Sequence, residues 1–249
     1  MRLTVVGCSG SFPGPYAAAS CYLVEADGFT LVLDLGSGSI GPLQRYVELD
    51  AVGAVLVSHL HADHCADLSS YYVARRYHPR GPLPPVDVYG PAGVGDHVAR
   101  AYGTVDRAAL DRVFTFHDIG VGQLTVGPFL LTLARTAHPV ECHATRVEVG
   151  GASLVYTGDT GPSDAVVALA AGTDLLLAEA SFVDGAANPA NLHLTGRDAG
   201  EMALAAGVGR LVVTHVPPWH DPAAAVAEAE AAFGRECALA VPGSRFEVG

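Results

Sequence analysis

Short apolar runs rich in Val, Leu and Ala alternate with turn-forming Gly, Pro and Asp along most of the chain. Runs of this length and composition are typical of buried strands. They predict strands near residues 2–6, 20–26, 29–34, 53–58, 86–90, 122–126, 129–137, 143–149, 152–156, 174–178, 210–214 and 237–242. Asp27-Gly28 and Gly150-Gly151 separate neighbouring runs as turns, and the first is a pair that two-residue hairpins favour.

Helix-like stretches are fewer, and several carry start signals. The pattern predicts helices over 66–77, 91–101, 162–171, 196–206 and 222–234. Pro91 stands at the start of the second, Thr195 caps the fourth and Asp221 caps the last. The two halves of this order pack best as two sheets face to face, with helices on the outer faces. We therefore expect an α/β fold, an αββα sandwich of two mixed sheets, formed by a single domain over residues 1–249.

The composition predicts a folded core and sets aside several other classes of protein. Half of the 249 residues are hydrophobic and 16% are charged, which argues against disorder. No apolar run reaches membrane-spanning length, and the N-terminus reads as a strand rather than a secretion leader, so we expect a cytoplasmic protein without a membrane partner. The five cysteines contain no C-x-x-C pair, which argues against a disulfide framework and against a separate cysteine-type zinc site.

The charge of the chain bears on its partners. The formal net charge is −12, and all fourteen basic residues are Arg. A protein that grips long nucleic acid usually displays a basic face, so no stable complex with long nucleic acid is expected. A small anion that reaches a cationic metal centre would not be excluded in the same way. A homodimer is compatible with the sequence.

The most informative motif is His59-Leu60-His61-Ala62-Asp63-His64, which follows the apolar run 53–58. Imidazoles packed this tightly repel one another once protonated, and a divalent cation resolves the conflict by accepting their lone pairs. His59 and His61 alternate along the loop, whereas Asp63 and His64 fall on the opening turn of the next helix. One loop can therefore supply two adjacent metal sites. The alternative is a solvated histidine-rich loop, against which further ligand-type residues downstream argue.

Three more ligand-type residues follow strand-like runs in the second half of the chain. They are His138 after 129–137, Asp159 after 152–156 and His215 after 210–214. Each alone would be an ordinary cap or surface group. Combined with the motif at 59–64, they form a specific metal-ligand pattern.

This pattern resembles the metallo-β-lactamase superfamily, whose signature is H-x-H-x-D-H, a later His, an Asp in a G-D-T context and a final His. The resemblance covers nearly the whole chain, including the loop 7–11 and the turn Asp34-Leu35-Gly36. It implies two metal ions, one bound by His59, His61 and His138 and the other by Asp63, His64 and His215, with Asp159 bridging them. Histidine and carboxylate ligands suit zinc and admit manganese or iron.

Glu179-Ala180-Ser181 and His193-Leu194-Thr195 look like the H-E-A-T and H-x-T elements of RNase Z-like phosphodiesterases. There the histidine, oriented by the glutamate, donates a proton to the leaving oxygen; the alternative is a strand-end carboxylate and a loop histidine. RNase Z enzymes also carry a basic tRNA-gripping arm, whereas only 20 residues (139–158) stand between His138 and Asp159 here. The sequence is most similar to actinobacterial proteins described as atypical class II cyclic-nucleotide phosphodiesterases, which share Thr214-His215-Val216-Pro217-Pro218-Trp219.

The resemblance implies a dinuclear phosphodiesterase that hydrolyses small phosphodiesters, with the 3′,5′-cyclic nucleotides cAMP and cGMP as expected substrates, by attack of a metal-bridging hydroxide. Asp63, His193 and Glu179 are then the catalytic residues. Alternatives are an RNase Z-like ribonuclease, a lactone, thioester or sulfate-ester hydrolase, and a metal-binding scaffold without turnover. Arg75 and Arg76 could bind phosphate, and Trp219 and Tyr71 could stack on a base, although helix-face and core positions are their more ordinary roles.

Overall fold

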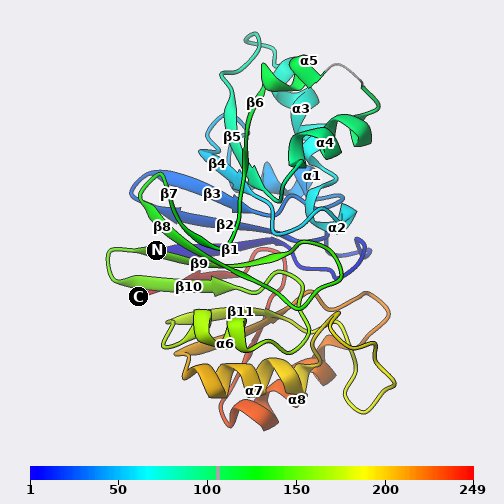
Figure 1. Cartoon of the computed structure of the whole chain (residues 1–249), viewed down its shortest axis with the longest axis vertical. Coiled ribbons are helices and arrows are strands. Elements are labelled where there is room, and N and C mark those ends of the chain that lie inside the picture. The colour runs from blue at the N-terminus through cyan, green and yellow to red at the C-terminus, as the bar shows by residue number, and fades with distance from the viewer. Residues whose placement is uncertain (105–106) are drawn as a thin grey trace.

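Two seven-stranded sheets form the centre of the protein, as seen in a computed structural model that describes residues 1–104 and 107–249 (Figure 1). In spatial order the first sheet contains β14 (Arg245–Glu247), β1 (Arg2–Gly7), β2 (Cys21–Ala26), β3 (Phe29–Leu33), β4 (Ala54–Leu56), β5 (Val86–Gly90) and β6 (Phe114–Asp118). The second contains β13 (Ala238–Leu239), β12 (Arg210–Thr214), β11 (Leu175–Glu179), β10 (Ala152–Tyr156), β9 (His143–Val149), β8 (Phe129–Arg135) and β7 (Gly122–Val126). Both sheets mix parallel and antiparallel pairs, as expected.

Helices cover the two outer faces, which confirms the predicted αββα sandwich. On the side of the first sheet lie α1 (Ile40–Leu43), α2 (Ala62–Cys65), α3 (Leu68–Arg76), α4 (Val94–Tyr102) and α5 (Arg107–Asp111). On the side of the second lie α6 (Asp164–Ala170), α7 (Gly196–Ala206) and α8 (Pro222–Phe233). None of the described helices combines the length and apolarity that crossing a bilayer would require.

Three layers of apolar side chains hold the sandwich together, and adjacent residues of one strand serve different layers. In β4, Ala54 and Leu56 face the core between the sheets, whereas Val55 faces the core beneath α3 and α4. In the second sheet Leu175 and Leu177 face the central core, and the residue between them faces α7. Burial on both faces explains why these strands are continuous apolar runs.

Local signals placed some element boundaries correctly. Thr195 caps α7 with a full capping box formed with Asp198, and Asp221 caps α8 through the backbone N–H of Ala223. The turn at Asp27-Gly28 has positive φ at both residues, as a tight hairpin between β2 and β3 requires.

Other boundaries differ from the sequence prediction. Helix α4 begins at Val94 rather than at Pro91, because Gly93, with a φ of 81°, completes a turn first. Strands β6 and β14 were not predicted, since both are sheet edges in which polar and apolar residues alternate. The strand predicted at 237–242 is reduced to the two residues of β13.

Strand direction determines where the polar residues collect. In the second sheet β8 and β10 are both antiparallel to β9, and β10, β11 and β12 are parallel, so four carboxyl ends lie at one edge. In the first sheet β3 and β4 are parallel, and β1 runs in the same direction because both β1 and β3 are antiparallel to β2. Loops that follow these strands therefore meet at one rim of the sandwich.

Candidate metal centre

The seven residues expected to bind metal come together at this rim. His59 and His61 lie in the loop after β4, and Asp63 and His64 lie in α2, as the sequence predicts. His138, Asp159 and His215 follow β8, β10 and β12. Their donor atoms form two groups that share Asp159 and could each hold a metal ion. The first ligand group comprises His59, His61, His138 and Asp159, and the second comprises Asp63, His64, Asp159 and His215.

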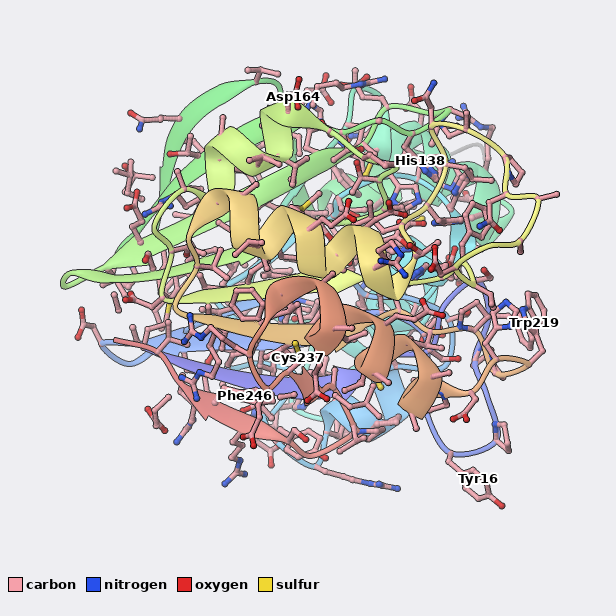
Figure 2. The ribbon with its side chains drawn as sticks, turned by 90° about the horizontal axis from the view of Figure 1, so that it is seen from below. Tyr16, His138, Asp164, Trp219, Cys237 and Phe246 are labelled. Atoms are coloured by element: carbon pink, nitrogen blue, oxygen red, sulfur yellow. The ribbon has the colours of Figure 1, made fainter. Side chains whose placement is uncertain are left out.

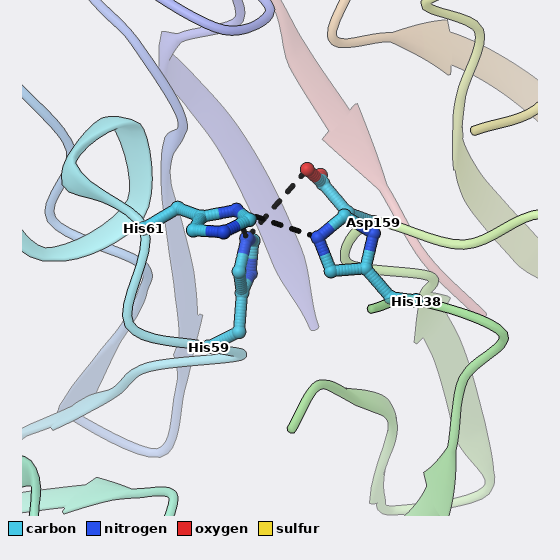
Figure 3. A group of neighbouring side chains, drawn as sticks. All are labelled: His59, His61, His138 and Asp159. Carbon is cyan, nitrogen blue, oxygen red and sulfur yellow. Dashed lines mark hydrogen bonds and ion pairs between the residues drawn. The ribbon is translucent and has the colours of Figure 1, made fainter. Parts of the chain in front are cut away.

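The first ligand group spans both sheets (Figure 3). His61 Nδ1 lies 2.9 Å from His59 Nε2 and 3.3 Å from His138 Nε2. One Asp159 oxygen lies 3.6 Å from His59 Nε2. The side chains of His59, His138 and Asp159 are buried, whereas His61 is exposed and forms the open side of the group.

The second ligand group is buried throughout. His215 Nε2 lies 3.2 Å from an Asp63 oxygen and 3.2 Å from His64 Nε2. The second Asp159 oxygen, Oδ1, lies 3.2 Å from His64 Nε2 and 3.5 Å from His215 Nε2. Because each Asp159 oxygen faces a different group, this carboxylate is placed to bridge two cations.

A buried network behind the second group fixes the orientation of His64. The carboxylate of Asp34 accepts hydrogen bonds from His64 Nδ1 at 2.7 Å, from the Tyr156 hydroxyl at 2.6 Å and from the Ser58 hydroxyl at 2.9 Å. The Ser58 backbone N–H also donates to Asp34, at 2.7 Å. With its hydroxyl proton committed to Asp34, Ser58 accepts from His59 Nδ1 at 3.1 Å. His59 and His64 therefore both direct Nε2 into the centre.

Two further histidines are oriented in the same way. His138 Nδ1 donates to the carbonyl oxygen of Leu192 at 3.0 Å. The Ser181 hydroxyl donates to the His215 carbonyl oxygen and so accepts from His215 Nδ1, both at 2.8 Å. In each ring the Nδ1 proton is used within the protein and the Nε2 lone pair faces the centre, which is the arrangement that metal-binding histidines require.

The donor set fits a pair of divalent cations. Ring nitrogens converge in both groups: His61 Nδ1 faces the Nε2 atoms of His59 and His138 at 2.9 and 3.3 Å, and His64 Nε2 faces His215 Nε2 at 3.2 Å. Asp159 Oδ1 is buried without a hydrogen-bond partner. A cation between these atoms would satisfy both conditions, because it accepts lone pairs and offsets the buried negative charge.

The ionisation of the side chains differs between the two groups. Burial and the neighbouring His64 lower the pKa of His59 well below its usual value, so His59 is a neutral imidazole. Burial would lower the pKa of His64 too, but the carboxylates of Asp159 and Asp34 raise it well above the usual value. Burial likewise opposes ionisation of Asp63, and hydrogen bonds from His215 and His64 nevertheless hold its pKa far below normal. Before a cation binds, His64 thus carries the compensating positive charge.

Glu179 and His193 form a pair beside both groups. His193 Nδ1 donates to Glu179 at 2.9 Å, and the same carboxylate accepts from the backbone N–H groups of Thr160 at 2.7 Å and Ser181 at 3.2 Å. The His193 ring lies 5.6 Å from the His138 ring and 5.8 Å from the His215 ring. Burial lowers the pKa of His193, but the Glu179 carboxylate more than offsets this and raises it to about 9. The imidazole is therefore a protonated group with its Nε2 side available.

Sequence reasoning did not assign roles to Asp34, Ser58, Tyr156 and Ser181. A signal existed for Asp34, which stands in a recognisable turn and has a φ of 58°, a conformation that asparagine and aspartate tolerate best. Nothing in the sequence marked Tyr156, which belongs to an apolar strand and meets Asp34 only through packing of the two sheets.

Several other candidates lie away from the centre. Arg75 is buried and donates to Leu49 and Pro84 carbonyl oxygens, so it is not available to phosphate. Tyr71 packs in the core beneath α3, which excludes it as a stacking surface. Cys65, by contrast, directly follows His64 in α2; it is buried and donates to the carbonyl oxygen of His61.

Comparisons with known proteins agree with this geometry. Residues 32–216 match the family described as Beta-lactamase superfamily domain. Uncharacterized protein ML1173 of Mycobacterium leprae is 41% identical over 253 residues, covering 100% of this chain and 89% of that protein. Ribonuclease Z of Haloferax volcanii is 28% identical, and the alignment covers 100% of this chain and 95% of that protein. Probable metallo-hydrolase YhfI of Bacillus subtilis is 32% identical, and the alignment covers 99% of this chain and 100% of that protein. The crystal structure of the metallo-beta-lactamase fold protein YhfI has a TM-score of 0.88 at 30% identity, covering 99% of each chain.

Proposed function

The chain belongs to the beta-lactamase superfamily, and from this membership we propose that it is a metal-dependent phosphodiesterase acting on small diesters, with 3′,5′-cyclic nucleotides as the substrate class. The observation that carries the proposal is the Glu179–His193 pair, at 2.9 Å, beside the two ligand groups. Hydrolysis of an alkyl phosphodiester needs a proton for its leaving alkoxide, and this pair can supply one.

The two ligand groups would hold two divalent cations, with zinc as the first choice and manganese or iron as alternatives. Cations bound there supply a water of lowered pKa and offset the negative charge that develops on the phosphoryl oxygens. Asp63 is placed to act both as a ligand and as a partner for that water, because its contacts with His215 at 3.2 Å and His64 at 3.4 Å are both made through Oδ2.

His193 protonates the leaving group. As the phosphorus–oxygen bond to the leaving alkoxide breaks, the Nε2 proton passes to that oxygen, which in a 3′,5′-cyclic nucleotide becomes a free hydroxyl on the ribose of the ring-opened product. Glu179 keeps the Nδ1 proton in place and stabilises the imidazolium before the transfer. Two backbone N–H groups and burial hold the glutamate itself in one position.

Cleavage of tRNA precursors is the second candidate, because a curated relative that aligns with the whole chain is a Ribonuclease Z. Two features favour a small substrate instead. The segment between His138 and Asp159 is filled by the β9–β10 hairpin and leaves no room for an inserted arm. The net charge of −12 would repel a polyanion.

Acyl substrates such as lactones and thioesters are the third possibility, since one fold can host several hydrolytic chemistries. Thioester hydrolysis expels a thiolate, which hardly requires a proton. With a thioester the buried glutamate and its paired histidine would have no function in turnover, whereas a diester with an alkoxide leaving group uses both.

The test is the leaving-group dependence of His193→Ala. We expect the variant to lose about 10²- to 10⁴-fold in kcat on 3′,5′-cyclic AMP, the usual contribution of a general acid, and far less on bis-p-nitrophenyl phosphate. The matched control is His117→Ala, which removes a histidine paired with Asp87 at 2.7 Å but belonging to β6. Equal losses on both diesters would reject the proton-donor role. Turnover of a lactone, a thioester or a tRNA precursor, with none of either diester, would reject the proposed function.

A further inference from the structure

An aromatic pair, Phe12 and Trp219, lies on the surface, in the loops that follow β1 and β12. The two rings are 4.7 Å apart and tilted by 41°, and the residues are 38% and 64% exposed. Tryptophan is highly buried on average, so an indole left this open on a well-ordered loop needs a reason. We propose that this pair is a stacking platform for the nucleobase of a nucleotide substrate, an inference that rests on the proposed function and specifies its substrate.

Each of the loops that carry the two rings is closed by a local hydrogen bond. Trp219 follows Pro217-Pro218, and the turn is closed by a hydrogen bond from the His220 N–H to the Pro217 carbonyl oxygen at 2.9 Å. On the other side the Ser9 hydroxyl donates to the Phe12 carbonyl oxygen at 2.7 Å. A preformed platform of this kind loses little conformational entropy when a ligand binds.

Both loops are fixed to a residue of the metal centre. The Gly10 N–H donates to the Val216 carbonyl oxygen at 3.2 Å, and the His215 N–H donates to the Cys8 carbonyl oxygen at 3.0 Å. Gly10 lies so close to the ligand-bearing loop that a Cβ there would come within 2.3 Å of the His215 carbonyl oxygen. The position of the aromatic pair is therefore set by the same backbone that places His215.

The pair lies within reach of a substrate held at the centre. Trp219 is four residues beyond His215, which limits their separation to about 14 Å of extended chain. Figure 2 shows Trp219 projecting outward on the side of the molecule where His138 also lies. A nucleotide whose phosphate occupies the centre would therefore have the rings within this distance of His215.

Stacking is also the recognition that this charge distribution favours. In the described part of the chain the ion pairs of the two ligand groups are with histidine, and none is with arginine. A nucleobase is uncharged and presents an aromatic face, so it gains affinity from stacking without meeting the repulsion of an acidic protein.

The first experiment uses Trp219 as its own probe, because it is the single tryptophan of the chain. We expect 3′,5′-cyclic AMP to quench its fluorescence saturably, since a stacked purine contacts the indole directly. Ribose 5-phosphate, which lacks a base, should leave the fluorescence unchanged. Equal responses to both compounds, or none to the nucleotide, would overturn the platform.

The second experiment separates base binding from chemistry. Trp219→Ala should raise KM for 3′,5′-cyclic AMP about 5- to 100-fold, the range expected for one lost stacking contact, with kcat/KM unchanged for the baseless ribose 3′,5′-cyclic phosphate. Trp219→Phe should restore most of the loss. Tyr16→Ala, at a neighbouring and 94% exposed aromatic outside the pair, is the matched control and should match the wild type.

The outcomes distinguish this inference from the proposed function. Hydrolysis of cyclic nucleotides with no specific effect of Trp219→Ala would overturn the platform and leave the phosphodiesterase intact. Saturable quenching without hydrolysis of any diester would support the platform and reject the phosphodiesterase. A change of oligomeric state in Trp219→Ala, measured by light scattering, with unaltered KM would identify the pair as a contact between copies and overturn the platform.

Discussion

The two ligand groups differ although they are adjacent and share Asp159. The first offers three histidines besides the shared carboxylate and is open at His61. The second offers two carboxylates and is buried throughout. Because two carboxylates attract a cation more strongly than one, and burial shields that attraction from water, we expect the second group to bind its metal ion more tightly.

The support behind the two groups differs as well. In the second group, side chains hold His64 and His215: Asp34 with Tyr156 behind one ring and Ser181 behind the other. In the first group the Ser58 hydroxyl orients His59, but a backbone carbonyl orients His138, and His61 turns Nδ1 rather than Nε2 to its neighbours. The comparison suggests a permanent site beside a more exchangeable one, and the following predictions test it in order of expected effect.

Asp159→Ala should have the largest effect, because it removes the one ligand common to both groups. We expect both metal sites to be lost, and turnover to fall on the order of 10³-fold or more as several kcal/mol of charge stabilisation disappear. Metal content by mass spectrometry and diester kinetics measure this. Retention of one full equivalent of metal would show that the two groups are independent of the shared carboxylate.

Asp34→Ala should weaken the second group selectively. Loss of the carboxylate that orients His64 should lower metal affinity about 10- to 100-fold at that group alone. Asp174→Ala is a matched control, because Asp174 accepts from the N–H and hydroxyl of Ser153 at 2.7 and 2.9 Å, as Asp34 does from Ser58. Competition titrations with a chromophoric chelator measure the affinities. Equal losses in both variants would indicate a general effect on folding.

Metal removal should proceed in two phases. His61 is exposed, so a chelator can reach the first group while the second is still shielded, and one equivalent should leave faster than the other. His61→Ala should abolish the fast phase and leave about one equivalent bound. Stopped-flow absorbance of the metal–chelator complex records the two phases. A single phase in the wild type would contradict the proposed difference.

The smallest expected effect is the release of protons when a metal ion binds. The raised pKa of His64 means that it is protonated at neutral pH, and a cation must displace that proton. The lowered pKa of His59 means that it is already neutral there. Binding at the second group should therefore release about one proton and weaken as the pH falls, whereas the His59 ligand releases none. Calorimetry in buffers with different ionisation heats measures the released protons.

The features predicted from the sequence depend on neighbours along the chain. The cluster at 59–64 is contiguous, and the caps Thr195 and Asp221 act within their own first helical turns. The apolar runs predicted most strands, because burial on both faces leaves a continuous hydrophobic signature. The edge strand β6 lacks this signature, since one side of an edge meets water, and its alternating residues did not predict it.

The sequence by itself determined the two-sheet sandwich, the identity of the seven candidate ligands and the Glu179–His193 pair. Only the tertiary structure decided that Asp34 and Tyr156 stand behind His64, that Arg75 and Tyr71 are buried, and that Phe12 meets Trp219. These contacts join residues far apart in the chain, and they form only when the two sheets pack and the carboxyl ends of their strands share one rim. A one-dimensional pattern records which side chains are available, whereas packing decides which of them meet.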